Sequence, residues 1–429
     1  MIDKIVNESG WYTPRNDVRK DLDRDLMVKY AVIGGGINGV SAAYRLAQLG
    51  HEPILLEADE IGSGGTGASN AIITTTSGSE ESAVELLRIF GEIKTKRLYD
   101  SVGKGVSFIR SIIEREKIDC VYGLPGYLCL FDNEDEAMNE MRVQDIFGNK
   151  SILVHNNSLK KFIDGDYYKA GLFFSDSDKN FVIDPLKFIR EMANISERIG
   201  TDIYENSKVV IIRENNRNVS LFLQNGREIT TEKVIVSTNP YTLGLKGLPL
   251  SVKKRGVPIC QYLSLLEFAD YTPVRNCGGF ADEEDIAYMF GNVNGRKMMV
   301  SSGNFEFIAS REPSELNINI EANLDVVRKR FGRDDFSLIK SWAGKIGGSP
   351  TKGFLPQTGF YDEREKVYIG FFGDGLPIGC YLGLTAANVV SNNGEVPKDY
   401  NLQRNDSLLL ELAGIAPAWA IDRFGKKFL

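Results

Sequence analysis

The chain has 429 residues, a net charge of −7, 42% hydrophobic residues and 25% charged residues. This length exceeds what one hydrophobic core usually organises, so we expect two joined domains. The composition is ordinary for a globular protein, and the negative charge argues against a nucleic-acid partner. Only two histidines occur, and none of the five cysteines forms a C-x-x-C pair, which argues against histidine triads, metal sites and redox dithiols.

The N-terminal residues do not indicate export. They are too polar for a signal peptide, and no apolar run in the chain is long enough to cross a bilayer. We therefore expect a cytoplasmic protein with no integral membrane segment. Residues 1–27 are charged and irregular around Trp11 and Tyr12. Such an arm is expected to pack on its own domain, although it could instead cover a site.

The strongest pattern is a short apolar run, a glycine turn and an amphipathic stretch that follow one another. Residues 30–33 fit a buried parallel strand, and residues 37–49 fit a helix. Between them Gly34, Gly36 and Gly39 match G-x-G-x-x-G, in which the glycines permit a tight turn, close approach of a pyrophosphate and close helix packing. The helix start offers free N–H groups to that pyrophosphate.

A second strand, residues 53–57, ends in Glu57, at about the 20-residue spacing expected for a carboxylate that binds ribose. Strand, helix, spacing and acid together favour a dinucleotide site over an ordinary glycine-rich turn. The next loop, residues 58–71, is dense in small residues, with hydroxyl and amide groups that can bind phosphates or a flat ring. A flexible surface loop is the alternative.

Apolar periodicity predicts helices at residues 80–117, 133–144, 184–200 and 321–331. Strands are predicted at residues 126–131, 208–213, 219–223, 233–237, 256–267, 287–291 and 297–302. The strands after residue 255 suggest a second, antiparallel sheet.

The C-terminal part repeats the order of strand, glycines and helix. A glycine-rich block at 341–356 precedes a strand at 366–372, and Gly373-Asp374-Gly375 then opens an apolar helix. Such a turn directs N–H groups toward an anion or an electron-rich carbonyl. Asp374 either attracts a cationic amine or caps the helix. The amphipathic tail, residues 401–429, is expected to dock on the protein itself rather than on a membrane.

Together these segments resemble the flavin-dependent amine and amino-acid oxidoreductases of the D-amino-acid oxidase superfamily, and most closely its γ-glutamylputrescine oxidoreductase branch. The motifs that carry the resemblance are residues 32–39, 56–57, 62–70, 237–239, 342–344, 355–356, 367–368 and 373–375.

The resemblance implies an α/β fold of mixed α+β character, in which a Rossmann-like FAD-binding domain is interleaved with an antiparallel-sheet substrate domain. The FAD-binding domain is predicted to comprise residues 28–100, 182–245 and 342–400, and the substrate domain residues 101–181 and 246–341, between the arm (1–27) and the tail (401–429).

The resemblance also implies an extended FAD, with its adenine near Val209 and its flavin by the turn at Gly373. Sarcosine oxidases attach flavin through a cysteine in the segment after the tryptophan; residues 342–356 contain none, so FAD is predicted to be noncovalent. The residues expected to bind it are Gly34, Gly36, Ile37, Asn38, Gly39, Glu57, Ala58, Ser63, Gly64, Thr66, Ala68, Ser69, Asn70, Val209, Val210, Thr238, Asn239, Gly344, Gly373, Asp374, Gly375 and Leu376.

The implied reaction is hydride transfer from the carbon beside an amine to flavin N5, followed by hydrolysis of the imine, with O2 or another carrier as electron acceptor. The substrate is expected to be a small-molecule amine. A hydroxy-acid or polyol dehydrogenase and a non-catalytic flavin-binding regulator remain as alternatives. The polar groups expected nearest the substrate are Asp374, Tyr262, Tyr288, Arg255 and Lys345.

Overall fold

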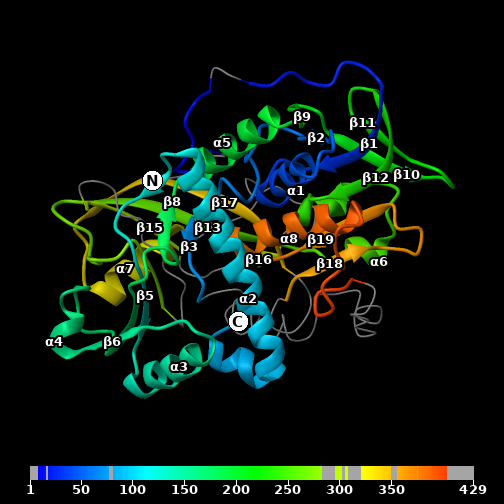
Figure 1. Cartoon of the computed structure of the whole chain (residues 1–429). Helices are drawn as coiled ribbons and strands as arrows, with labels where there is room; N and C mark the ends of the chain where they lie inside the picture. The colour runs from blue at the N-terminus through cyan, green and yellow to red at the C-terminus, as the bar shows by residue number, and fades with distance from the viewer. Residues whose placement is uncertain are drawn as a thin grey trace.

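The computed structural model describes residues 8–15, 18–76, 81–282, 295–301, 305–307, 320–348, 355–373 and 375–402. Helices and strands are mixed along the chain, and helices lie against the largest sheet (Figure 1). The predicted mixed α/β fold with a Rossmann-like parallel sheet is confirmed.

The largest sheet has eight strands and a parallel centre. The parallel strands run in the order β19–β12–β1–β2–β9; β18 pairs antiparallel with β19, and β10 and β11 form an antiparallel hairpin beside β12. β1 begins earlier than predicted because its first residues also pair with β12. The strands are β1 (Leu26–Ile33), β2 (Ile54–Leu56), β9 (Asp202–Tyr204), β10 (Val209–Glu214), β11 (Val219–Leu223), β12 (Glu228–Val236), β18 (Gln357–Phe360) and β19 (Val367–Phe371).

In the described part of the chain, three smaller sheets contain the remaining strands. In one, β13 is the centre of an antiparallel sheet, with β17 along one edge and β15 and β16 along the other. The second has the order β14–β5–β7–β6 and the third β3–β8–β4. Their bounds are β3 (Ile72–Ile73), β4 (Val121–Tyr122), β5 (Tyr127–Phe131), β6 (Ile152–His155), β7 (Ala170–Phe174), β8 (Phe181–Ile183), β13 (Val257–Phe268), β14 (Gly279–Asp282), β15 (Lys297–Val300), β16 (Phe305–Phe307) and β17 (Phe336–Gly348).

One segment of this region differs from the sequence prediction. The glycine-rich block at 341–356 was not predicted as a strand, yet residues up to Gly348 continue β17, because they pair with β13 along its whole length. The strand predicted at 287–291 lies outside the described residues, as does the tail beyond residue 402. The domain boundaries stay a prediction.

The predicted long helices are present. α5 begins after Asp184, whose carboxylate accepts hydrogen bonds from the N–H groups of Leu186 and Lys187 at 3.0 and 2.9 Å. α2 is bent at Gly91, where φ is +71°. The helices are α1 (Ile37–Gln48), α2 (Ala83–Glu116), α3 (Glu134–Ile146), α4 (Asn156–Leu159), α5 (Pro185–Arg198), α6 (Leu250–Lys253), α7 (Ile320–Phe331) and α8 (Leu376–Val390), with a 3₁₀ helix, η1 (Asn239–Gly244).

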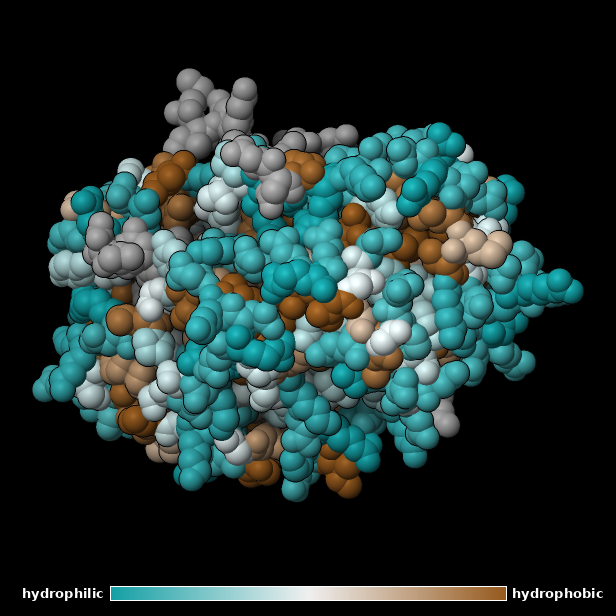
Figure 2. Space-filling view, turned by 45° about the horizontal axis from the view of Figure 1, so that its top comes forward, coloured by the Kyte–Doolittle hydropathy of each residue, from teal (hydrophilic) through white to brown (hydrophobic). Residues whose placement is uncertain are grey.

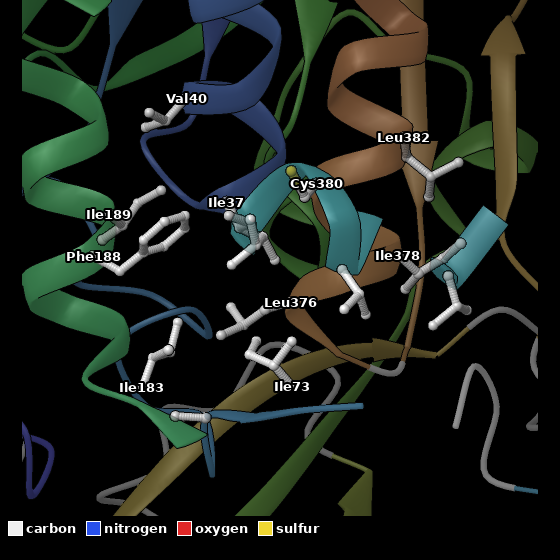
Figure 3. Packing of buried hydrophobic residues seen from close by; sticks show 14 of the residues in the cluster. Ile37, Val40, Ile73, Ile183, Phe188, Ile189, Leu376, Ile378, Cys380 and Leu382 are labelled. Atoms are coloured by element: carbon white, nitrogen blue, oxygen red, sulfur yellow. The ribbon is translucent and has the colours of Figure 1, made fainter. Parts of the chain in front are cut away.

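The main core lies where α1, α5 and α8 meet. Figure 3 shows Ile37 and Leu376, near the starts of α1 and α8, in one cluster with Phe188 and Ile189 of α5. Burial of large aliphatic and aromatic side chains contributes about 1.5–3 kcal/mol each. This core therefore holds the starts of two helices that are far apart in sequence.

The surface is mostly polar in the view of Figure 2, where hydrophobic residues form small separate groups. None of the helices in the described ranges is both long and apolar enough to cross a bilayer.

A first prediction concerns the crossing of α1 and α8. A Cβ at Gly383 would lie 2.2 Å from the carbonyl oxygen of Asn38, whereas one at Gly103 in α2 meets nothing within 4 Å. We expect Gly383→Ala to lower the free energy of unfolding by about 1–3 kcal/mol through overpacking. Gly103→Ala should raise it by up to about 1 kcal/mol, because alanine is the better helix former. Guanidinium unfolding of both variants measures this, and equal effects would contradict the tight crossing.

Candidate active site

In the glycine turn after β1 and the start of α1, Gly34 and Gly39 lie where no side chain would fit. Gly34 has φ +107° and donates its N–H to the carbonyl of Leu56 at 2.8 Å. A Cβ at Gly39 would lie only 1.8 Å from the carbonyl oxygen of Gly34. The first turn of α1 contains no acidic residue. Its N-cap, Gly36, has no side chain that could accept hydrogen bonds from the N–H groups of that turn. The helix start therefore suits an external anion.

Glu57 lies at the end of β2 beside this turn. Its carboxylate accepts hydrogen bonds from the N–H groups of Gly35, at 2.5 Å, and Asp59, at 2.9 Å. Burial raises the pKa of Glu57, and these backbone hydrogen bonds partly offset the rise. The backbone carbonyl of Glu57 also accepts from the N–H of Ser207 at 2.7 Å. The segment that leads into Val209 and Val210 thus passes next to Glu57.

The small-residue loop folds back onto the glycine turn. The N–H of Gly62 donates to the carbonyl of Gly35 at 3.1 Å, and Thr66 Oγ1 accepts from the N–H of Ile37 at 2.9 Å. Thr66 is only 8% exposed. These contacts favour the interpretation of this segment as part of a site over that of a flexible surface loop.

The C-terminal glycine turn lies beside the start of α1. A Cβ at Gly379 would be 2.8 Å from Cγ2 of Ile37 and 2.7 Å from the ring of Phe372. Asn38 is 4% exposed, and its amide donates to the carbonyl of Gly379 at 3.0 Å. Its Oδ1 accepts from Ser237 Oγ, just after β12, at 2.6 Å. One buried side chain therefore links α1, α8 and the end of β12.

Asn239 joins the end of β12 to β17 and to the C-terminal turn. Its amide donates to the carbonyl of Phe372 at 2.9 Å. A Cβ at Gly347 in β17 would lie 1.9 Å from Asn239 Oδ1. Thr238, its neighbour, pairs its hydroxyl with that of Thr242 at 2.7 Å.

β17 also contacts the small-residue loop. A Cβ at Gly344 would lie 3.3 Å from the Cβ of Ala68, and a Cβ at Gly65 would lie 2.7 Å from the carbonyl oxygen of Lys345. The indole N–H of Trp342 donates to the carbonyl of Ala68 at 3.1 Å. Loop, strand and both glycine turns thus form one region.

The remaining residues predicted to bind FAD take different positions. Val209 is buried in the core under the main sheet, and Leu376 is 4% exposed among the residues of Figure 3. Asn70 accepts from the N–H of Ile72 at 3.1 Å. The rest lie in the loop or turns described above, with Ser63 exposed and Ala58 directly after Glu57. They are Ala58, Ser63, Gly64, Ser69, Gly373 and Gly375, whereas Val210 follows Val209 in β10.

The five predicted substrate residues are not all brought together. Lys345 Nζ lies 5.1 Å from the ring centre of Tyr241, which is itself 3.6 Å from a Cβ position at Gly64. Arg255 donates to Gln357 Oε1 at 3.2 Å, near the end of β19. Both cations therefore lie close to the combined region formed by the small-residue loop, β17 and the two glycine turns. Asp374 and Tyr288 lie outside the described residues.

Tyr262 faces away from the loop. On β13 it shares a face with Ser264, whose hydroxyl accepts from Asn323 of α7 at 3.0 Å. Gln261 points to the opposite face and pairs in register with Gly344, which contacts the loop. Gln261 is 7% exposed and donates to Ser301 Oγ at 3.2 Å. Gln261 was not among the residues predicted from the sequence, although the period-two alternation of a strand places it on the face opposite Tyr262.

The residues present fit an extended dinucleotide. A Cβ at Gly36 would meet only Thr66 Oγ1, at 3.1 Å, so backbone approach is open there. A carboxylate stands at Glu57, and the second helix start, at Gly375, has φ +79° and no capping side chain. The starts of α1 and α8 face the carboxyl ends of β1, β12 and β19, the edge of a parallel sheet where ligands bind.

Comparison with known sequences agrees with this geometry. A family profile described as "FAD dependent oxidoreductase" matches residues 29–389. The chain is 29% identical over 248 residues to the probable oxidoreductase OrdL of Haemophilus influenzae, covering 55% of this chain and 54% of that protein. It is 27% identical over 250 residues to the gamma-glutamylputrescine oxidoreductase of Escherichia coli, covering 58% and 56%. These alignments span little more than half of either relative.

Solved structures are similar over most of the chain. L-proline dehydrogenase from P. horikoshii superposes with a TM-score of 0.73 at 18% identity, covering 89% of this chain and 98% of that one. Glycine oxidase from Geobacillus kaustophilus superposes with a TM-score of 0.71 at 16% identity, covering 89% and 99%. At these identities the likeness concerns the fold.

A second prediction concerns the buried amide that links the two turns. Asn38→Ala leaves the carbonyl of Gly379 and the hydroxyl of Ser237 without this partner. We expect the free energy of unfolding to fall by about 1–3 kcal/mol, the cost of unsatisfied buried polar groups. Asn393→Ala is the control, because that amide is exposed and bonds only to Ser391. A loss from Asn38→Ala no greater than that of the control would refute the role of this junction.

Proposed function

The chain belongs to the family of FAD-dependent oxidoreductases, and from this premise we propose that it oxidises a carbon–nitrogen bond in an amine or amino-acid-type substrate. The match of the family profile to residues 29–389 confirms the family and FAD as the cofactor, both of which were predicted from the sequence. What remains a proposal is the placement of FAD, the substrate and the residues that act on it.

The observation that carries the proposal is the convergence of three distant segments. The glycine turn at Gly36, the small-residue loop and the turn at Gly373 are linked by hydrogen bonds through Thr66, Asn38 and Asn239. An elongated cofactor needs such a continuous set of contacts, because its phosphates and its ring lie far apart.

Each segment would have a separate task toward FAD. The N–H groups at the start of α1 would bind the pyrophosphate, and Glu57 would accept hydrogen bonds from the ribose hydroxyls. Thr66 would keep its loop close to the helix start, as its bond to the N–H of Ile37 indicates. The N–H groups near Gly375 would face an electron-rich carbonyl of the ring.

When bound, FAD would supply hydride acceptance. The carbon beside the amine would lose a hydride to N5 of the flavin, and water would then hydrolyse the resulting imine. The chain would orient the substrate against the ring and restrict water. Arg255 and Lys345 suit an anionic or carbonyl group of the substrate, because both cations lie by the combined region. O2 or another carrier would then reoxidise the flavin.

We propose that FAD is held without a covalent bond. The segment 342–356 contains no cysteine. Cys380, in α8 close after the turn, is fully buried, and burial raises the pKa of its thiol to about 12. Such a thiol is inert as a nucleophile.

A third prediction tests the placement and attachment of the cofactor. Gly36→Val would fill the space through which the pyrophosphate approaches the backbone, so we expect FAD affinity to fall at least about tenfold. Gly103→Ala, in open space, is the matched control. Flavin titration measures the affinity.

Acid precipitation of the wild-type protein should leave a yellow supernatant, whereas colour in the pellet would contradict noncovalent binding.

A fourth prediction tests the substrate class. Anaerobic mixing of the holoenzyme with amines and amino acids, including γ-glutamylputrescine, proline and glycine, should bleach the flavin absorbance with at least one of them. Hydroxy acids and polyols form the control set. Bleaching by the control set alone, or by no compound in either set, would overturn the proposed reaction.

A further inference from the structure

The loop of residues 61–70 has few side chains with which to hold its own shape. Its internal bonds include Gly67 N–H to the carbonyl of Gly62 at 3.0 Å. Ser69 Oγ donates to the carbonyl of Thr66 at 2.9 Å. Glycine-rich backbone carries a large conformational entropy, so a loop of this kind needs anchors from other parts of the chain.

One anchor comes from the N-terminal arm. The indole N–H of Trp11 donates to the carbonyl of Ser69 at 2.9 Å, beside the bond from Trp342 to the carbonyl of Ala68. Trp11 is only 5% exposed. A Cβ at Gly10 would lie 2.7 Å from the Trp342 ring, so the arm packs closely against that ring. Two indoles from distant parts of the chain thus bind consecutive carbonyls of the loop.

A second anchor holds the other end of the same loop. Glu205, after β9, is fully buried and accepts from the N–H of Ile61 at 2.7 Å. Arg15 of the arm binds both carboxylate oxygens of Glu205, each at 2.8 Å, and the backbone N–H of Arg19 donates at 2.8 Å. A buried carboxylate needs such partners, because an unpaired charge is costly. The arm therefore neutralises the group that fixes the start of the loop.

The anchors are connected to the glycine turn. Trp11 bonds to Ser69, Ser69 bonds to Thr66, and Thr66 accepts from the N–H of Ile37 in the first turn of α1. In Figure 1 the dark blue segment before β1 arches over the end of the molecule that holds α5, β9 and β2. The arm thus reaches both ends of the loop from outside.

We propose that residues 8–15, here called the strap, hold loop 61–70 in the shape that binds FAD, and that Trp11 is a positioning residue of the cofactor site. The proposal rests on the proposed placement of FAD on this loop. Because coupling between two binding events is reciprocal, bound FAD should also hold the strap in place.

The test separates this role from a contribution to general stability. Trp11→Phe keeps an aromatic ring in the core but removes the N–H that binds Ser69. We expect the FAD dissociation constant to rise about tenfold, as expected for the loss of a buried hydrogen bond. Hydrogen exchange of the holoenzyme should quicken in residues 61–70. Tyr400→Phe is the matched control, because it also removes the donor of a hydrogen bond from a buried aromatic ring, but that bond goes to Ser101 in α2.

A second variant keeps the proposal testable if Trp11→Phe does not fold. Arg15→Lys retains the positive charge but cannot form the two-pronged bond to Glu205, and it should also weaken FAD binding, by about threefold to tenfold. The reciprocal effect is measured by trypsin cleavage of the strap, which added FAD should slow in the wild-type protein and not in Trp11→Phe.

The outcomes distinguish this proposal from the one it rests on. If Gly36→Val binds FAD as tightly as the wild type, the placement of FAD is wrong. If Gly36→Val loses FAD while Trp11→Phe and Arg15→Lys retain wild-type affinity, the placement stands and the strap proposal is overturned. A lower unfolding midpoint of Trp11→Phe with unchanged FAD affinity would likewise overturn it, since the strap would then only add stability.

Discussion

The arrangement of the site depends on one buried junction, where the amide of Asn38 binds Gly379 across 341 positions of sequence and also accepts a hydrogen bond from Ser237. A buried amide is stable only when its partners are in place, so this junction has a single favourable geometry. It brings the starts of α1 and α8 together at the carboxyl ends of the parallel strands. Gly383 permits the approach, because no larger residue would leave Asn38 where it is.

Around this junction, glycines let segments of the backbone lie closer together than residues with side chains would allow. Gly344 lies close to Ala68, and Gly65 and Gly347 lie so close to the backbone of β17 and to Asn239, respectively, that an added side chain would force a shift. Small residues let three backbones approach one another and present N–H groups to a ligand, but they provide few contacts of their own. Support therefore comes from outside the loop, from Trp342, and from Glu205 with its arginine partner. The order of a site with this composition therefore depends on the elements that surround it.

The chemical character of the site agrees with its family. Backbone N–H groups, amides, the carboxylate of Glu57 and the cations Arg255 and Lys345 lie in or beside the region, and the chain has only two histidines in all. An enzyme whose cofactor performs the difficult step needs position and electrostatics more than proton-transfer residues. The combination of a histidine-poor chain and a backbone-rich site is therefore consistent with flavin chemistry.

The sequence by itself determined the local elements and the family. The glycine spacing after β1, the acid at Glu57 and the Asp184 cap are short-range patterns, and each predicted helix or turn follows from residues a few positions apart. Only the tertiary structure decided which of these pieces meet. It turned Tyr262 toward α7 and Gln261 toward the loop, extended β17 through a glycine-rich block, and laid Trp11 across Ser69. Such contacts join residues that are dozens of positions apart, and local propensity carries no information about them, because their energy arises only when the folded chain brings the partners together.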